Sequence, residues 1–231
     1  MLPIIFLPGM MCDARLFFPQ IAALSCKHTV LIAPMGEART MAKLAELVLE
    51  KAPPRFALAG LSMGGILAME ILKQASERVD RVALLDTNPL AERPEIKARR
   101  VPQIEAVQSG ELARVMREQM IPNYFANDVS TRNLQHLCVE MALQLGPEVF
   151  INQSIALRDR PDQTETLRGF TGKSLVVCGR EDVLCPVDRH ELMRDLLPDS
   201  RLEIIEDAGH LITLEKPEQT TAALTRWMEE E

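Results

Sequence analysis

The stretch FALAGLSMGG, residues 56–65, decides the interpretation of this chain. Residues 56–61 form a short apolar run of the length of a buried strand, and a helical pattern follows over residues 63–74. Ser62 therefore lies at a sharp turn from a strand into a helix.

The neighbours of Ser62 have the spacing G-x-S-x-G, with Gly60 and Gly64 on either side. A side chain at either glycine would collide with the helix or with the adjacent strand, so this turn needs small residues. The helix that begins at Met63 also presents free N–H groups, which can stabilise negative charge that develops close to Ser62. The pattern indicates an activated serine.

Outward from this stretch, apolar runs alternate with segments of helical period along most of the chain, as in parallel sheets with crossover helices. The predicted strands are residues 3–7, 29–33, 56–61, 79–86, 174–179 and 202–206, and the predicted helices are residues 14–24, 38–50, 63–74, 187–197 and 217–230. We expect an α/β fold with a mostly parallel sheet of about six strands and helices on both faces.

The alternation stops between Asn88 and Glu165, where no strand is predicted. Amphipathic segments there are interrupted by Pro94, Pro102, Pro122, Pro147 and Pro161. This region is predicted to be an inserted helical lid of three or four short helices, with helix starts at Asn127-Asp128 and Gly146-Pro147. The predicted domains are therefore a core of residues 1–87 and 166–231, and a lid of residues 88–165.

A serine hydroxyl needs a base to remove its proton and an acid to orient that base. Of the four histidines, His210 directly follows the last predicted strand and its loop, at the expected edge of the sheet. The other three, His28, His136 and His190, are interpreted as surface or packing residues. His210 is the predicted general base.

Asp182 is the predicted acid because it follows the strand at residues 174–179, which gives the order nucleophile, acid, base along the chain. Asp86 is the main alternative, since it ends the strand before the lid and could reach the same histidine. Glu181 and Asp207 are further candidates.

A tetrahedral oxyanion requires two fixed donors, and the N–H of Met63, directly after the nucleophile, is one candidate. The loop after the first strand offers the second, because Gly9 allows a tight turn that can direct the Met10 N–H toward the site. Met10 and Met63 are therefore predicted to form the oxyanion hole.

Together these features resemble the α/β-hydrolase superfamily, in particular its small lidded esterases and its acyl-carrier and C–C bond hydrolases. The nucleophile turn corresponds to residues 60–64, the acid loop to residues 179–186 and the histidine loop to residues 207–210. Two departures are visible: many relatives have His-Gly in place of Pro8-Gly9, and many begin with two additional strands. The resemblance implies hydrolase chemistry on a sheet with a trimmed edge.

The lid should select the substrate, and apolar residues near the site predict a small to medium, mainly apolar acyl or alkyl group. The predicted substrate contacts are Met11, Tyr124, Phe125 and Phe150. The lid also contains Arg93, Lys97, Arg99, Arg100, Arg114 and Arg117. If these residues align, they could bind a carrier protein or a coenzyme A conjugate, which would favour a thioester.

The sequence therefore predicts a carboxylic-ester hydrolase that forms an acyl-enzyme on Ser62 and acts on a small-molecule ester. A thioesterase, a C–C bond hydrolase with the same three residues, and a ligand receptor with this fold are the alternatives.

The composition of the chain argues against several other classes of protein. A net charge of −7 disfavours binding to nucleic acid or to an anionic membrane. The five cysteines lack the spacing of a disulfide framework or a zinc site, and no glycine loop for a phosphate cofactor is present, so neither a metal nor a cofactor is expected. No segment resembles a signal peptide, and a cytoplasmic location is expected. The oligomeric state is not predicted.

Overall fold

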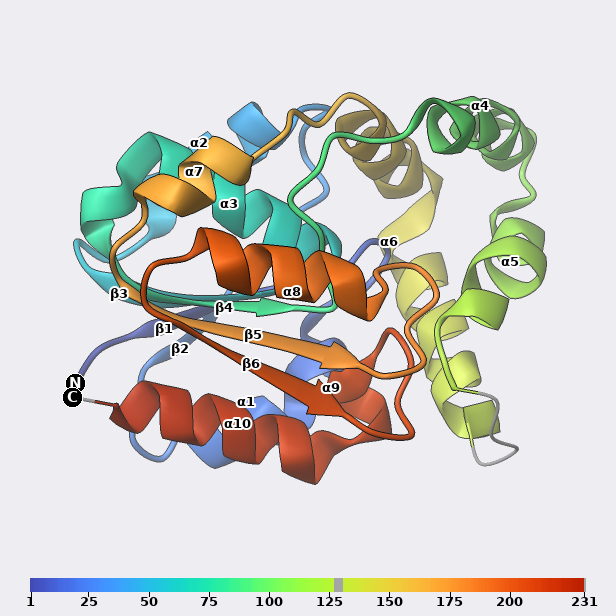
Figure 1. Ribbon diagram of the computed structural model, residues 1–231. Coiled ribbons are helices and arrows are strands. Elements are labelled where there is room, and N and C mark those ends of the chain that lie inside the picture. Colours follow the sequence, from blue (N-terminus) through green and yellow to red (C-terminus); the bar gives the residue numbers. More distant parts are fainter. Residues whose placement is uncertain (127–130, 231) are drawn as a thin grey trace.

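A parallel sheet of six strands forms the centre of the computed structural model, which describes residues 1–126 and 131–230. The strands are β1 (Ile4–Leu7), β2 (Val30–Ile32), β3 (Phe56–Leu61), β4 (Val79–Leu85), β5 (Lys173–Gly179) and β6 (Ser200–Ile205). Their order is β2-β1-β3-β4-β5-β6, and all neighbouring pairs are parallel. All carboxyl ends therefore meet at one edge of the sheet, where ligands bind in such folds (Figure 1).

Helices cover both faces of the sheet, as its apolar strands require (Figure 1). One face carries α2 (Met41–Lys51), α3 (Met63–Ala75), α7 (Thr164–Gly169) and α8 (Val187–Leu196); the other carries α1 (Phe18–Leu24), α9 (Ile212–Glu215) and α10 (Pro217–Glu229). Short 3₁₀ turns occupy Ala14–Phe17 and Ser76–Arg78. Every residue of β3 is buried, whereas the edge strand β2 is only partly covered. The central position of β3 explains its continuous apolar sequence.

The helical segment between β4 and α7 lies beyond the carboxyl ends of the strands (Figure 1). It contains α4 (Pro94–Gln108), α5 (Leu112–Val115), a π-helical turn (Met116–Met120), a 3₁₀ turn (Ile121–Asn123) and α6 (Arg132–Arg158). The helix α4 is longer than the short helices that the proline spacing predicted, because Pro102 is accommodated within it.

One predicted helix start in this segment agrees with the backbone geometry. Gly146 has φ 86° and breaks α6 into two helices, the second of which begins with Pro147. The other predicted start, Asn127-Asp128, lies outside the described residues. No helix in the described parts of the chain is long and apolar enough to span a membrane.

Candidate active site

The turn between β3 and α3 holds Ser62 in a strained conformation at the carboxyl edge of the sheet. Ser62 has φ 55°, which is rare for residues other than glycine. Its backbone is fixed on both sides, because its N–H donates to the Leu85 oxygen at 2.9 Å and its carbonyl accepts from Thr87 Oγ1 at 2.7 Å. These bonds to the end of β4 allow the turn to hold the serine side chain above the sheet.

Two glycines allow the close approach that this turn requires. A Cβ on Gly60 would overlap the backbone of Gly64, and a Cβ on Gly64 would overlap the carbonyl oxygen of Leu7 in β1. Both obstacles are main-chain atoms, which cannot move aside as a flexible side chain can. The spacing G-x-S-x-G is therefore a packing requirement between α3, β3 and β1.

Replacing Gly64 by alanine should destabilise the protein by about 3 kcal/mol or more, since the added methyl group forces α3 away from β1. Gly169→Ala is a matched control, because no atom of the described residues lies within 4 Å of a Cβ added there at the end of α7. Urea denaturation of both variants measures the difference. Equal stability of the two variants would show that the turn can relax around the methyl group.

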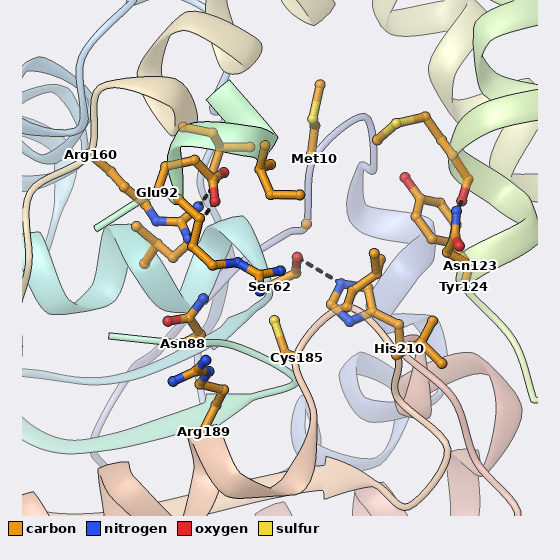
Figure 2. Close-up of a pocket in the computed structure, with 18 of the residues that line it drawn as sticks. Met10, Ser62, Asn88, Glu92, Asn123, Tyr124, Arg160, Cys185, Arg189 and His210 are labelled. Atoms are coloured by element: carbon orange, nitrogen blue, oxygen red, sulfur yellow. Dashed lines mark hydrogen bonds and ion pairs between the residues drawn. The ribbon is translucent and has the colours of Figure 1, made fainter. Parts of the chain in front are cut away.

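Three predicted side chains, Ser62, His210 and Asp182, form one hydrogen-bonded chain. His210 Nε2 lies 2.8 Å from Ser62 Oγ (Figure 2). On the other side of the ring, His210 Nδ1 lies 2.8 Å from Asp182 Oδ2. Both His210 and Asp182 are only 3% exposed. With Nδ1 donating to the carboxylate, Nε2 is free to accept the serine proton, which is the arrangement that general-base activation needs.

The loop around Asp182 keeps its carboxylate ionised. Burial alone would raise its pKa, but the adjacent His210 and its hydrogen bond, together with two backbone donors, hold the pKa of Asp182 below its usual value. The donors are the N–H groups of Leu184 and Cys185, which lie 2.8 and 2.9 Å from Oδ1. A fixed anion therefore faces the imidazole.

Asp86, the main alternative acid, has different partners. Its Oδ1 accepts from the N–H of Gly179 at 2.9 Å, and its Oδ2 lies 3.5 Å from the N–H of Ile212. Burial and the charge of Asp182 raise the pKa of Asp86 well above its usual value. Asp86 therefore joins the end of β5 to the segment after His210, and no hydrogen bond links its carboxyl group to the imidazole in the described chain.

The two remaining acid candidates lie at the rim of the histidine loop. Glu181 accepts a hydrogen bond from the N–H of Ala208, which fixes the loop before His210. Asp207 is exposed and has φ 53° in the turn after β6. Neither side chain is hydrogen-bonded to the imidazole of His210.

The fully buried His190 joins the end of β4 to the acid loop. Its Nε2 accepts from the N–H of Thr87 at 3.0 Å, so Nδ1 carries the proton and donates to the Pro186 oxygen at 3.3 Å. Burial lowers the pKa of His190 to about 4, since the imidazolium form would lose both its hydration and the hydrogen bond to Thr87. The sequence interpretation of His190 as a packing residue agrees with this position.

The neutral His190 should make stability depend on pH. Its pKa of about 4 in the folded protein is below the ordinary 6.5, so its contribution is complete above pH 6.5 and is lost as the pH falls toward 4. Between about pH 7 and pH 5 this group should lower the free energy of unfolding by about 2 kcal/mol. Denaturant unfolding of the wild type and of His190→Gln at both pH values isolates this contribution. An unchanged pH dependence in the variant would contradict the assignment.

The two predicted oxyanion donors lie on the elements that flank Ser62. Met63 is the first residue of α3, and the first N–H groups of a helix have no acceptor within that helix. Met10 follows Gly9 in the turn after β1, and a Cβ on Gly9 would lie 3.6 Å from the Cβ of Ser62. Both backbone segments are therefore adjacent to the nucleophile candidate.

A cavity of about 530 Å³ opens above Ser62 and His210, between the carboxyl edge of the sheet and the helices of residues 88–165. Of the predicted substrate contacts, Tyr124 lines this cavity. Met11, Phe125 and Phe150 do not, and these three assignments are corrected. Met11 and Phe150 are fully buried in the core, and Phe125 packs against the core.

The sequence interpretation missed other residues that line the cavity, including Asn88, Arg160 and Arg189. Arg189 had a usable signal, because it lies in the first turn of the helix after the acid loop, near the carboxyl edge of the sheet. Arg160 had none, since it comes from the loop after α6.

The described chain contains one group of side chains that could hold a metal ion. It consists of Asp182, Cys185 and His210, whose ligand atoms all lie within 4.8 Å of one another. Burial raises the pKa of the Cys185 thiol well above its usual value. A protonated thiol is a weak ligand, because metals bind the thiolate. The existing bond between His210 and Asp182 suits proton transfer better than metal binding.

Comparison with known proteins agrees with the fold. The model of the alpha/beta hydrolase family matches residues 4–224. The chain therefore belongs to the alpha/beta hydrolase family. Among its curated relatives are a putative carbamate hydrolase of Yersinia enterocolitica, 23% identical over 95% of this chain and 84% of the relative, and a pimeloyl-[acyl-carrier protein] methyl ester esterase of Nitrosomonas europaea, 26% identical over 83% of this chain and 81% of the relative.

A thermophilic esterase from Thermogutta terrifontis, solved with malate bound, is a close structural relative. It superimposes with a TM-score of 0.89 and 27% identity, covering 99% of this chain and 89% of that chain. An enol-lactonase from Burkholderia xenovorans has the same fold, with a TM-score of 0.86 and 21% identity over 100% of this chain and 92% of that one. The relatives thus support a hydrolase.

Proposed function

We propose that this protein is a serine hydrolase that cleaves a carboxylic ester through an acyl-enzyme on Ser62. The observation that carries the proposal is the chain of two 2.8 Å hydrogen bonds from Ser62 through His210 to Asp182 at the base of the cavity. The family and its esterase relatives support the same reaction class.

In this mechanism Ser62 Oγ attacks the ester carbonyl carbon while His210 Nε2 takes the hydroxyl proton. Asp182 stabilises the imidazolium that forms. The N–H groups of Met10 and Met63 bind the oxyanion of the tetrahedral intermediate. His210 then gives its proton to the leaving alcohol, and a water molecule, activated by the same imidazole, hydrolyses the acyl-enzyme and releases the acid.

We also propose that residues 88–165 act as a lid that selects the substrate, with residues 1–87 and 166–231 as the hydrolase core. The cavity has apolar side chains from both parts, among them Ile66, Ile96, Met120 and Leu157. A volume of about 530 Å³ suits a small to medium alkyl or acyl group. A small-molecule ester is therefore the proposed substrate.

Turnover of short-chain 4-nitrophenyl esters tests the proposal. We expect hydrolysis that a serine-directed fluorophosphonate abolishes, with the label on Ser62. Labelling of another serine, or hydrolysis that survives complete labelling, would overturn the mechanism. Tight binding of esters without turnover would instead favour a receptor with this fold.

A further inference from the structure

The wall of the proposed ester site contains a buried cluster of two arginines and one glutamate. Arg160 Nη1 and Nη2 lie 2.9 and 3.2 Å from the two oxygens of Glu92, and Arg100 Nη2 lies 2.9 Å from the same carboxylate. The three side chains are only 6%, 7% and 11% exposed, for Arg160, Glu92 and Arg100 respectively. Two cations thus share one anion, which leaves a buried positive charge.

Arg100 lines this wall and lacks a full set of hydrogen-bond acceptors. Its Nε is buried and has no hydrogen-bond partner among the described residues, and its Nη1 lies 3.9 Å from the sulfur of Met10. Met10 belongs to the loop that supplies a proposed oxyanion donor. A buried guanidinium without a full set of acceptors is costly, and an anion nearby compensates its charge.

A further arginine approaches the cavity from the opposite part of the fold. Arg189 on α8 is 30% exposed, and its Nε lies 3.9 Å from the carboxylate of the solvent-exposed Asp188. Figure 2 shows Glu92 and Arg160 on one side of Ser62, with Arg189 on another side below Asn88. Cationic groups therefore reach the cavity both from the proposed lid and from the hydrolase core.

The charge of the lining contrasts with that of the whole protein. The carboxylate and guanidinium side chains that line the cavity are Glu92, Arg93, Arg99, Arg100, Arg160 and Arg189, five cations against one anion. Asp182 lies beneath His210 and already pairs with it. A chain with a net charge of −7 thus concentrates positive charge at its candidate nucleophile, which attracts anions and repels cationic ligands.

We infer that the substrate of this site carries an anionic oxygen group, a carboxylate or a phosphate, that binds Arg100 and Arg189 while its ester carbonyl lies at Ser62. This inference rests on the proposed ester hydrolysis and narrows its substrate class. Guanidinium groups bind carboxylate and phosphate through paired N–H donors, and such charge-assisted bonds are stronger than neutral ones. The apolar side chains of the cavity then contact the chain between the anion and the ester.

Two matched substrate pairs test the inference and separate the two sources of the anion. Monomethyl glutarate against dimethyl glutarate compares a carboxylate with its neutral ester. Acetyl coenzyme A against S-acetyl-N-acetylcysteamine compares a phosphate-bearing thioester with its neutral truncated form. In at least one pair, we expect kcat/KM for the anionic substrate to be at least about ten times that for the neutral substrate. We call this quotient the anion preference, and added salt should reduce it.

The variants Arg100→Gln and Arg189→Gln should each lower the anion preference, the ratio of kcat/KM for the anionic substrate to kcat/KM for the neutral one, toward one. Arg100→Gln leaves Arg160 and Glu92 as a neutral pair, and Arg189 is partly exposed, so both variants should fold. Arg114→Gln is the matched control, because Arg114 is exposed, pairs with Glu111 and does not line the cavity. Its ratio should equal that of the wild type.

Equal kcat/KM within both pairs, or a ratio that neither arginine variant lowers, would overturn the inference. If Ser62-dependent hydrolysis is observed but the anionic and neutral substrates react equally fast, the inference is overturned and the proposed function stands. A complete absence of Ser62-dependent turnover on every substrate would instead overturn the proposed function, and the inference with it.

Discussion

Ser62→Ala is expected to lower kcat/KM for a short ester by about five orders of magnitude while the protein remains folded. Without the hydroxyl no acyl-enzyme can form, and only the oxyanion donors and substrate binding remain to accelerate the reaction. The fold should persist because the bonds of Ser62 to Leu85 and Thr87 use its backbone atoms, which alanine retains.

Steady-state kinetics and thermal melts of purified Ser62→Ala measure both parts of this expectation. Ser109→Ala is the matched control: its hydroxyl bonds the Glu105 oxygen on the exposed end of α4 and does not line the cavity. Its activity should equal that of the wild type. Turnover by Ser62→Ala within tenfold of the control, about 1.4 kcal/mol in activation free energy, would refute nucleophilic catalysis by this residue.

Asp182→Asn is expected to lower kcat by about ten thousandfold. The amide has no negative charge to stabilise the imidazolium, and it favours the histidine tautomer that cannot accept the Ser62 proton. The loop should survive, because the side-chain oxygen of asparagine can still accept the N–H bonds of Leu184 and Cys185.

Asp86→Asn is the internal control for this prediction. Asp86 and Asp182 are both buried, and both accept backbone N–H bonds, but only Asp182 bonds His210. Since burial favours the uncharged form of Asp86, a neutral amide is a conservative replacement, and kcat should fall less than about tenfold. If Asp86→Asn lowers kcat more than Asp182→Asn while its melting temperature is unchanged, Asp86 is the acid.

Local sequence signals were sufficient for the sheet and for the turn around Ser62. The strands alternate with helices at a spacing that only a parallel sheet with crossovers satisfies, and all six predicted strands are present. Gly60 and Gly64 were recognisable because their requirement arises from the turn itself. The position of His210 followed from the same logic, since the loops after parallel strands lie at one edge of the sheet.

The sequence favoured Asp182 as the acid but left Asp86 as an alternative, because both residues follow neighbouring parallel strands and reach the same edge. The turn of residues 182–185, closed by backbone N–H groups on Asp182, directs that carboxylate toward His210. The bonds of Asp86 to Gly179 and Ile212 direct it elsewhere. These are contacts between distant segments, which no local pattern encodes.

The sequence by itself therefore determined the sheet, the serine turn and the histidine loop, because strand and helix periodicity and the demand for small residues act over a few positions. Only the tertiary structure decided which side chains line the cavity. Met11 and Phe150 are buried in the core, whereas Arg160 meets Glu92 from 68 positions away and Arg189 approaches from α8. The physical reason is that the charge of a cavity depends on how separate helices pack around it, and this packing brings together residues far apart in the chain.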